Sequence, residues 1–279
     1  ENGAQSQTIT ITDSLSAPTV TLSTSASSVA ENGSDLTLTA TLNRQTFEDV
    51  TVTLTGTGTS TAGTDYASLS TITISAGSTT GTTSFNPTDD SVYEGSETAI
   101  IAITGVSGGS ATESGTQSKT ITITDNETAP TVTLSTSASS VAENGSDITL
   151  TATLSGATSE DVTVTLTGTG TSTAGTDYSS LSTITISAGS TTGTTTFNPT
   201  DDNVYEGSET AIIAITGVSG GDATESGTQS ETITITDRLA APTVTLSSSA
   251  SSVAENGSDL TLTATLNRQT FEDVTVTLT

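Results

Sequence analysis

Three observations predict an all-β fold for this chain. The expected fold is a tandem of seven-stranded antiparallel β-sandwich domains arranged end to end. Apolar residues alternate with Thr over short stretches, as in "LTLTATL" at 36–42 and "VTVTLT" at 50–55. A period of two is typical of half-buried strands whose Leu, Val and Ile face inward. Gly- and Ser-rich turns separate these stretches, and no helical periodicity of useful length interrupts them. The third observation is a long internal repeat.

The repeat has a period of 112 residues, because "APTVTLS" begins at Ala17, Ala129 and Ala241. A unit of this length is a domain rather than a solenoid turn. Residues 18–129 and 130–241 differ at 13 of 112 positions, which indicates modules with one role. The chain reads as a piece of something longer, and its expected parts are the C-terminal tail of a preceding repeat (1–16), repeat one (17–128), repeat two (129–240) and the N-terminal part of a third repeat (241–279).

Seven strands are expected in repeat one, and short Gly- and Ser-rich turns between them favour a sandwich. The expected strands are 19–23, 35–42, 48–55, 69–75, 80–86, 97–104 and 117–124.

Composition excludes several classes of function. The 279 residues contain no Cys, His, Met or Trp, only four Lys plus Arg, and 31 acids, for a net charge of −27. Without His or Cys, the usual nucleophile–base pairs and Cys/His metal sites cannot form. Phosphates of nucleic acid and anionic membrane surfaces need basic partners, so neither is expected to bind. The longest apolar run, "AIIAI" at 99–103, is far too short for membrane insertion.

Strand counting places most of the loop acids at one end of the domain. In an up-and-down arrangement, the first, third and fifth connections share one pole with the end of the seventh strand. The carboxylates on these four segments are Glu31, Asp65, Asp89, Asp90, Glu94, Glu97 and Asp125. Converging carboxylates repel one another unless they are protonated or neutralised, and at pH 7 a hard cation is the natural solution.

Calcium is the cation that this chemistry favours. Ca²⁺ accepts six to eight oxygens in flexible geometry, whereas Mg²⁺ demands a stricter octahedron. Zn²⁺ would recruit His or Cys, which the chain lacks. The alternative is a solvated acidic pole without a bound ion.

At these residues the chain resembles the Calx-β domain, an immunoglobulin-like module. The matching motifs are "VAENG" (29–33), "TAGTDY" (61–66), "TDDSVYEGSE" (88–97) and "TITITDNE" (120–127). The resemblance implies Ca²⁺ as the cofactor, bound by loop acids and by one backbone carbonyl in each repeat. In repeat one the implied ligands are Glu31, Asp65, Asp89, Asp90, Glu94, Glu97 and Asp125, with the carbonyl of Val92. In repeat two they are Glu143, Asp177, Asp201, Asp202, Glu206, Glu209 and Asp237, with the carbonyl of Val204.

The end of the seventh strand departs from the pattern of the Calx-β domain. Strong binders carry a run of acids there, whereas this chain has "DSL" at 13–15, "DNE" at 125–127 and "DRL" at 237–239. Arg238 places a cation beside the second site. Fewer or weaker ions are therefore expected, especially in repeat two.

The links between repeats follow a second pattern. Leu15 in one link accompanies Phe47 in the next loop, and Leu239 accompanies Phe271, whereas the link with Glu127 precedes a loop without Phe. We hypothesise that Leu and Phe pack together at alternate junctions, which would contribute on the order of 1–2 kcal/mol. Joint inheritance by two repeat types would give the same pattern.

A structural role is expected rather than catalysis, because the chain has few aromatic residues to line a substrate cleft. The favoured interpretation is a spacer from a large extracellular bacterial surface protein, adhesin-like, whose partners are the neighbouring repeats and whose rod is stiffened by Ca²⁺. A self-associating extracellular filament with lateral contacts is the main alternative. Binding of a ligand or of ice by Thr rows is less favoured, because sheets twist.

Overall fold

The computed structural model describes residues 3–12 and 14–279 of the chain. Asp13, which ends the last strand of the preceding copy in the sequence pattern, lies outside the described residues. The chain divides into two compact units, Glu1–Thr128 and Ala129–Thr279. The described residues form strands, turns and loops, and they include no helix that could cross a membrane.

Repeat one contains a four-stranded sheet in the order β6-β3-β1-β9. Its strands are β1 (Thr19–Thr24), β3 (Leu36–Leu42), β6 (Thr80–Phe85) and β9 (Thr112–Glu113). β1 pairs with β3 and β3 with β6 in the antiparallel direction, whereas β9 runs parallel to β1.

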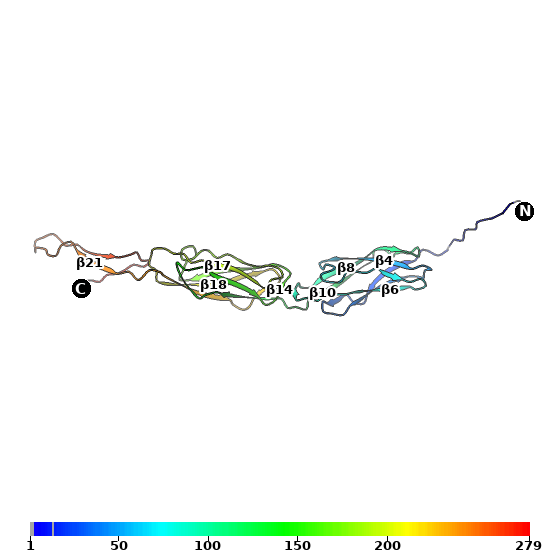
Figure 1. The fold of residues 1–279 in the computed structure, drawn as a ribbon, viewed down its shortest axis with the longest axis horizontal. Helices are drawn as coiled ribbons and strands as arrows, with labels where there is room; N and C mark the ends of the chain where they lie inside the picture. The colour runs from blue at the N-terminus through cyan, green and yellow to red at the C-terminus, as the bar shows by residue number, and fades with distance from the viewer. Residues whose placement is uncertain (1–2, 13) are drawn as a thin grey trace. The chain divides into compact units, whose positions relative to one another are not determined.

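A five-stranded sheet in the order β2-β10-β8-β4-β5 completes the sandwich. Its strands are β2 (Ser28–Ala30), β4 (Val50–Gly58), β5 (Ile72–Ile74), β8 (Glu97–Ser107) and β10 (Ser118–Thr124), and β7 (Val92–Tyr93) lies in the connection before β8. The long antiparallel neighbours β4, β8 and β10 can be followed in Figure 1. β2 runs parallel to β10 at the edge of the sheet.

The core lies between the two sheets, and the alternating sequence pattern explains it. In β3, every second residue is buried, whereas the Thr residues between them are exposed or half-buried. Tyr66 and Phe85 stack in this core with ring centroids 4.8 Å apart. The all-β sandwich predicted from the sequence is therefore confirmed. The parallel edge strands β2 and β9 are additions to the seven expected strands, and neither shows the apolar–Thr alternation.

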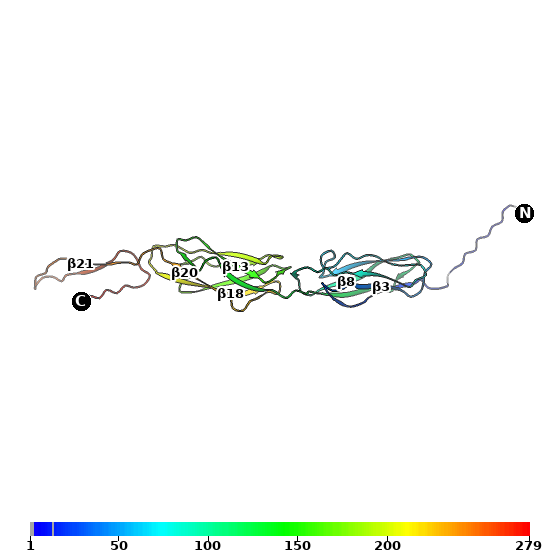
Figure 2. The same ribbon diagram turned by 60° about the horizontal axis from the view of Figure 1, so that its bottom comes forward.

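Repeat two has the same two sheets, in the orders β17-β13-β11-β19 and β12-β20-β18-β15-β16, and β13 and β18 are labelled in Figure 2. Its strands are β11 (Thr131–Thr136), β12 (Ser140–Ala142), β13 (Ile148–Leu154), β14 (Ala157–Thr158), β15 (Val162–Gly170), β16 (Ile184–Ile186), β17 (Thr192–Phe197), β18 (Ser208–Ser219), β19 (Thr224–Glu225) and β20 (Ser230–Thr236).

The last part of the second unit forms an antiparallel pair, β21 (Val244–Ser248) with β22 (Leu262–Leu266). Val244 faces Leu266, the register that Val20 and Leu42 adopt 224 residues earlier.

Main-chain hydrogen bonds join the loop after β22 to repeat two. Tyr205 N–H donates to the Gln269 carbonyl at 3.1 Å, and Phe271 N–H donates to the Tyr205 carbonyl at 3.1 Å. The Phe271 side chain nevertheless stays 73% exposed. In the first unit, Phe47 is fully exposed and Leu15 is 66% exposed, so the predicted packing of Leu against Phe is wrong there. Backbone pairing can position such a loop without burying its aromatic ring.

Candidate metal centre

Asp65 owes its position to the residue that follows it. Tyr66 is fully buried and stacks on Phe85, and its hydroxyl lies so close to Gly56 that a Cβ there would be only 2.0 Å away. One carboxylate oxygen of Asp65 accepts a hydrogen bond from Thr61 N–H at 2.5 Å. The aromatic anchor and this turn fix Asp65 at the end of the sandwich, where it is itself buried.

Glu31 is positioned by the parallel pairing of β2 with β10. Its N–H donates to the Thr124 carbonyl at 3.0 Å, which continues the pairing by one residue and places Glu31 beside Asp125. The Glu31 side chain is only 6% exposed. Its Oε1 atom is buried and has no hydrogen-bond partner among the described residues.

Asp125 ties the loop before β8 to the end of β10. Its Oδ2 atom accepts hydrogen bonds from Glu94 N–H at 2.5 Å and Gly95 N–H at 2.8 Å, and Oδ1 accepts from Glu127 N–H at 2.7 Å. Gly95 adopts a φ of 74°, a left-handed conformation that favours glycine. Asp125 is therefore an organiser of the backbone as well as a candidate ligand.

Two groups of three carboxylates form at this pole of repeat one. Within each group, one carboxylate oxygen from each residue lies within 4.8 Å of the others. The groups are Glu31 with Asp125 and Glu127, and Asp65 with Glu94 and Glu97. Glu127 is a candidate that sequence reasoning missed as a ligand. The only signal for it was the acidic ending "DNE" of the last strand.

The electrostatics of the pole disfavour the ionised state of several of these acids. Burial, followed by the charge of Asp125, raises the pKa of Glu31 from 4.5 to about 8. Burial and the adjacent Asp65 raise the pKa of Glu97 to about 7, and the same two causes raise the pKa of Glu94. For Asp125, burial opposes ionisation, but its three backbone N–H donors hold the pKa below its ordinary value.

Repeat two reproduces one of these groups. Asp177, Glu206 and Glu209 lie within the same 4.8 Å limit, and burial with the charge of Asp177 raises the pKa of Glu209 to about 7. Glu143 is 5% exposed, and its Oε2 atom has no hydrogen-bond partner among the described residues. Burial, followed by the charge of Asp237, raises the pKa of Glu143 to about 7.

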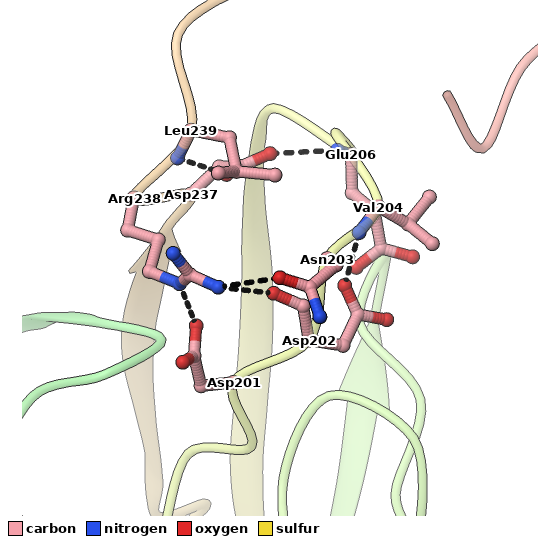
Figure 3. Close-up of polar contacts among 8 residues, drawn as sticks. All are labelled: Asp201, Asp202, Asn203, Val204, Glu206, Asp237, Arg238 and Leu239. Atoms are coloured by element: carbon pink, nitrogen blue, oxygen red, sulfur yellow. Dashed lines mark hydrogen bonds and ion pairs between the residues drawn. The ribbon is translucent and has the colours of Figure 1, made fainter. Parts of the chain in front are cut away.

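Asp237 organises the backbone of repeat two as Asp125 does in repeat one. It accepts hydrogen bonds from the N–H groups of Glu206 at 2.7 Å and Leu239 at 2.6 Å (Figure 3). A third N–H donor is Gly207, at 3.2 Å. Leu239 stands where repeat one has Glu127, so the third carboxylate of that group is missing.

The remaining expected ligands lie on the loop between the groups. Asp90 Oδ1 accepts a hydrogen bond from Val92 N–H at 2.7 Å, and Asp202 Oδ1 accepts one from Val204 N–H at 2.7 Å. Such Asx turns use a carboxylate oxygen to shape the loop. Among the described residues, the three carboxylate groups do not include Asp89, Asp90, Asp201 or Asp202. Metal binding by these four acids and by the carbonyls of Val92 and Val204 stays a prediction.

A family comparison identifies the repeats. The model of the LapA domain matches residues 16–128 and again residues 127–238. The chain belongs to the LapA domain family. Each LapA repeat therefore contains one complete sandwich with its acidic pole.

Solved structures of Calx domains are similar to this chain at low identity. CBD12 from CALX1.2 is 14% identical, with a TM-score of 0.37. The match covers 78% of this chain and 99% of the CBD12 chain. The calcium binding domain CBD12 of CALX1.1 is 16% identical, with a TM-score of 0.34 and coverages of 76% and 96%. The apo-form Calx CBD1 domain is 21% identical, with a TM-score of 0.33 and coverages of 39% and 98%. No curated protein sequence matches the chain.

Proposed function

We propose that this chain is a spacer segment of an extracellular, adhesin-like surface protein, and that Ca²⁺ binds the acidic poles of its LapA repeats and stiffens the array. The adhesin-related character of the LapA domain supports a place at the cell surface. The acids act here as ligands rather than as catalysts.

The buried, unpartnered carboxylate oxygens of repeat one carry the proposal. Glu31 Oε1 and Glu127 Oε2 are buried without a hydrogen-bond partner, and both residues belong to one group with Asp125. Burying an ionised carboxylate without a partner costs several kcal/mol. A cation bound by these oxygens would offset that cost.

The donor set suits a hard divalent cation. Every candidate side chain in the two groups of repeat one offers carboxylate oxygen, the ligand type that Ca²⁺ prefers. Glu31, Asp125 and Glu127 would hold one ion, and Asp65, Glu94 and Glu97 would hold another. The ions would supply charge neutralisation and cross-link loops that are distant in sequence.

The position of the group in the chain connects ion binding to stiffness. Glu127 lies only four residues before β11, the first strand of repeat two. An ion that holds Glu127 against Glu31 would shorten the free link between the repeats. Extracellular calcium modules have Kd values of roughly 10⁻⁴–10⁻³ M, which would keep the array loaded outside the cell and unloaded within it.

A Ca²⁺ titration of the full chain tests the proposal. After chelator treatment, the melting temperature is followed by calorimetry and the maximum dimension by X-ray scattering, with Mg²⁺ in parallel. We expect a rise in melting temperature between ~0.1 and ~10 mM Ca²⁺, accompanied by a narrower distribution of dimensions, and a smaller response to Mg²⁺.

Two double variants make the test specific. Glu31→Gln with Glu127→Gln removes two candidate ligands, whereas Asp35→Asn with Asp147→Asn removes two exposed acids away from the groups. The first should lose much of the response of repeat one to Ca²⁺, and the second should retain it. A melting temperature that does not respond to tens of millimolar Ca²⁺ would reject the metal site. Fibre growth that depends on protein concentration would favour a self-associating filament.

A further inference from the structure

The end of β20 carries an unusual charge for this protein. The whole sequence has four basic residues, Arg44, Lys119, Arg238 and Arg268, so Arg238 is the only one within residues 129–240. That single cation follows Asp237 directly, at the acidic pole of repeat two. Its placement against a strongly acidic background requires a specific explanation.

The guanidinium of Arg238 is held by the loop between β17 and β18 (Figure 3). Its Nε atom forms an ion pair with Asp201 Oδ1. Its Nη2 atom donates to the backbone carbonyl of Asp202 at 2.9 Å and to Asn203 Oδ1 at 2.9 Å. Three consecutive loop residues thus receive donors from one side chain at the end of the last strand.

The corresponding positions in repeat one have different chemistry. Asn126 stands in place of Arg238 and Ser91 in place of Asn203, so both ends of one contact differ between the repeats. Asn126 Nδ2 donates to the neighbouring Glu127 Oε1 at 3.1 Å. Leu239, in place of Glu127, removes the third carboxylate of the Glu31 group. The changes replace a net charge of −1 by +1 at two adjacent positions.

We infer that Arg238 is a built-in counterion of the loop that contains Asp201 and Asn203, and that together with Leu239 it excludes from repeat two the metal ion proposed for the Glu31, Asp125 and Glu127 group of repeat one. This inference rests on the proposed function. A guanidinium is always charged and its donors form a rigid fork, so it holds the loop at any metal concentration.

The two repeats therefore differ in metal dependence. Repeat one has two carboxylate groups for ions, and repeat two retains only the group of Asp177, Glu206 and Glu209. A unit charge ~6 Å from a divalent ion, in a dielectric like that of water, changes the binding affinity for that ion by about tenfold according to Coulomb's law. Arg238 and Leu239 together should weaken Ca²⁺ binding beside Asp237 by about a hundredfold.

Exchanging the strand ends between the repeats of the full chain tests the inference. Arg238→Asn with Leu239→Glu gives repeat two the ending of repeat one, and Asn126→Arg with Glu127→Leu does the reverse. Each side chain already occurs at the matching position of a near-identical repeat. By calorimetric titration, we expect the number of bound Ca²⁺ ions to rise by one in the first variant and to fall by one in the second.

A metal-free measurement tests Arg238 independently of Ca²⁺. In chelator, Arg238→Asn should lower the melting temperature of repeat two by about 3 °C, since a charge-assisted network is lost. Lys119→Asn, which removes a cation from β10 in repeat one, is the matched control and should not reproduce this shift in repeat two. If wild type binds no Ca²⁺, the proposed function fails and the exclusion of a metal ion by Arg238 fails with it, whatever the metal-free shift. If wild type binds Ca²⁺ but neither exchange alters its stoichiometry, the inference is overturned and the proposed function survives.

Discussion

Replacing Glu31 by Gln should stabilise repeat one when no divalent cation is present. The change keeps the shape of the side chain and removes its ability to ionise. Glu31 is buried beside Asp125, and its pKa is raised from 4.5 to about 8. Without a cation, the folded state must therefore keep a proton on a group that an unfolded chain would ionise at pH 7.

The size of the effect follows from this shift. Keeping the proton at pH 7 costs about 1.4 kcal/mol for each of the ~2.5 pH units above the ordinary pKa, or ~3.5 kcal/mol in total. Gln needs no proton, so the variant should gain up to that amount at pH 7. At pH 5 the gain should fall to ~0.7 kcal/mol. For a repeat of this size, ~3.5 kcal/mol corresponds to a melting-temperature increase of ~15 °C.

The assay is calorimetry of the full chain in chelator at pH 5, 6 and 7, repeated with saturating Ca²⁺. Asp35→Asn is the matched control, because Asp35 is an exposed acid of the same repeat outside the carboxylate groups. With Ca²⁺ the effect of Glu31→Gln should reverse, since the variant lacks a candidate ligand. A destabilised variant in chelator at pH 7, or a gain equal at pH 5 and pH 7, would refute the reasoning.

Three further outcomes are expected. In chelator, the melting temperature of the wild-type chain should fall as pH rises from about 4.5 to 8. The pKa values of two buried and two half-buried carboxyls are raised to about 7 or 8 in the folded state, which therefore binds more protons in that window. A flat profile would contradict these assignments. Gly56→Ala should destabilise repeat one by ~2–3 kcal/mol in a denaturant titration, since its Cβ would meet the buried Tyr66 hydroxyl at 2.0 Å. Gly105→Ala is the control and should have a smaller effect, because its Cβ would lie 3.7 Å from its nearest neighbour. Asp125→Ala should speed hydrogen exchange at the Gly95 amide, which would lose its acceptor, and unchanged protection there would show that Asp125 does not hold the loop.

The alternation of apolar residues and the counting of strands that run alternately up and down predicted much of this architecture. Alternation located the core of β3 and β4, because the side-chain period of a strand is two residues. Counting the strands then placed Glu31 and Asp125, which are far apart in sequence, at one pole of the domain. The short parallel strands β2 and β9 were not predictable in this way, since pairs of two or three residues leave little periodicity.

The grouping of the acids depended on details that the sequence pattern does not contain. Asp90 directs one oxygen to the N–H of Val92, which is a local turn geometry. Glu127 lies in the group of Glu31 and Asp125 just after the end of β10, where Asp125 accepts a hydrogen bond from the Glu127 N–H. The repeat alignment did indicate that Arg238 would alter the second site, but the contacts with Asp202 and Asn203 required the loop conformation.

The parallel pairing of β2 with β10 has a mechanical consequence. Tension along an array of such repeats enters each sandwich at β1, passes through it to β2 and leaves at the end of β10. In a parallel pair, these opposite pulls act in shear, so the bonds that join Ser28–Ala30 to Thr122–Thr124 carry the load together. A terminal antiparallel pair would instead unzip bond by bond. Glu31 and Asp125 directly follow these two segments, so a cation bound by both would cross-link the ends of β2 and β10 and strengthen the pairing against shear.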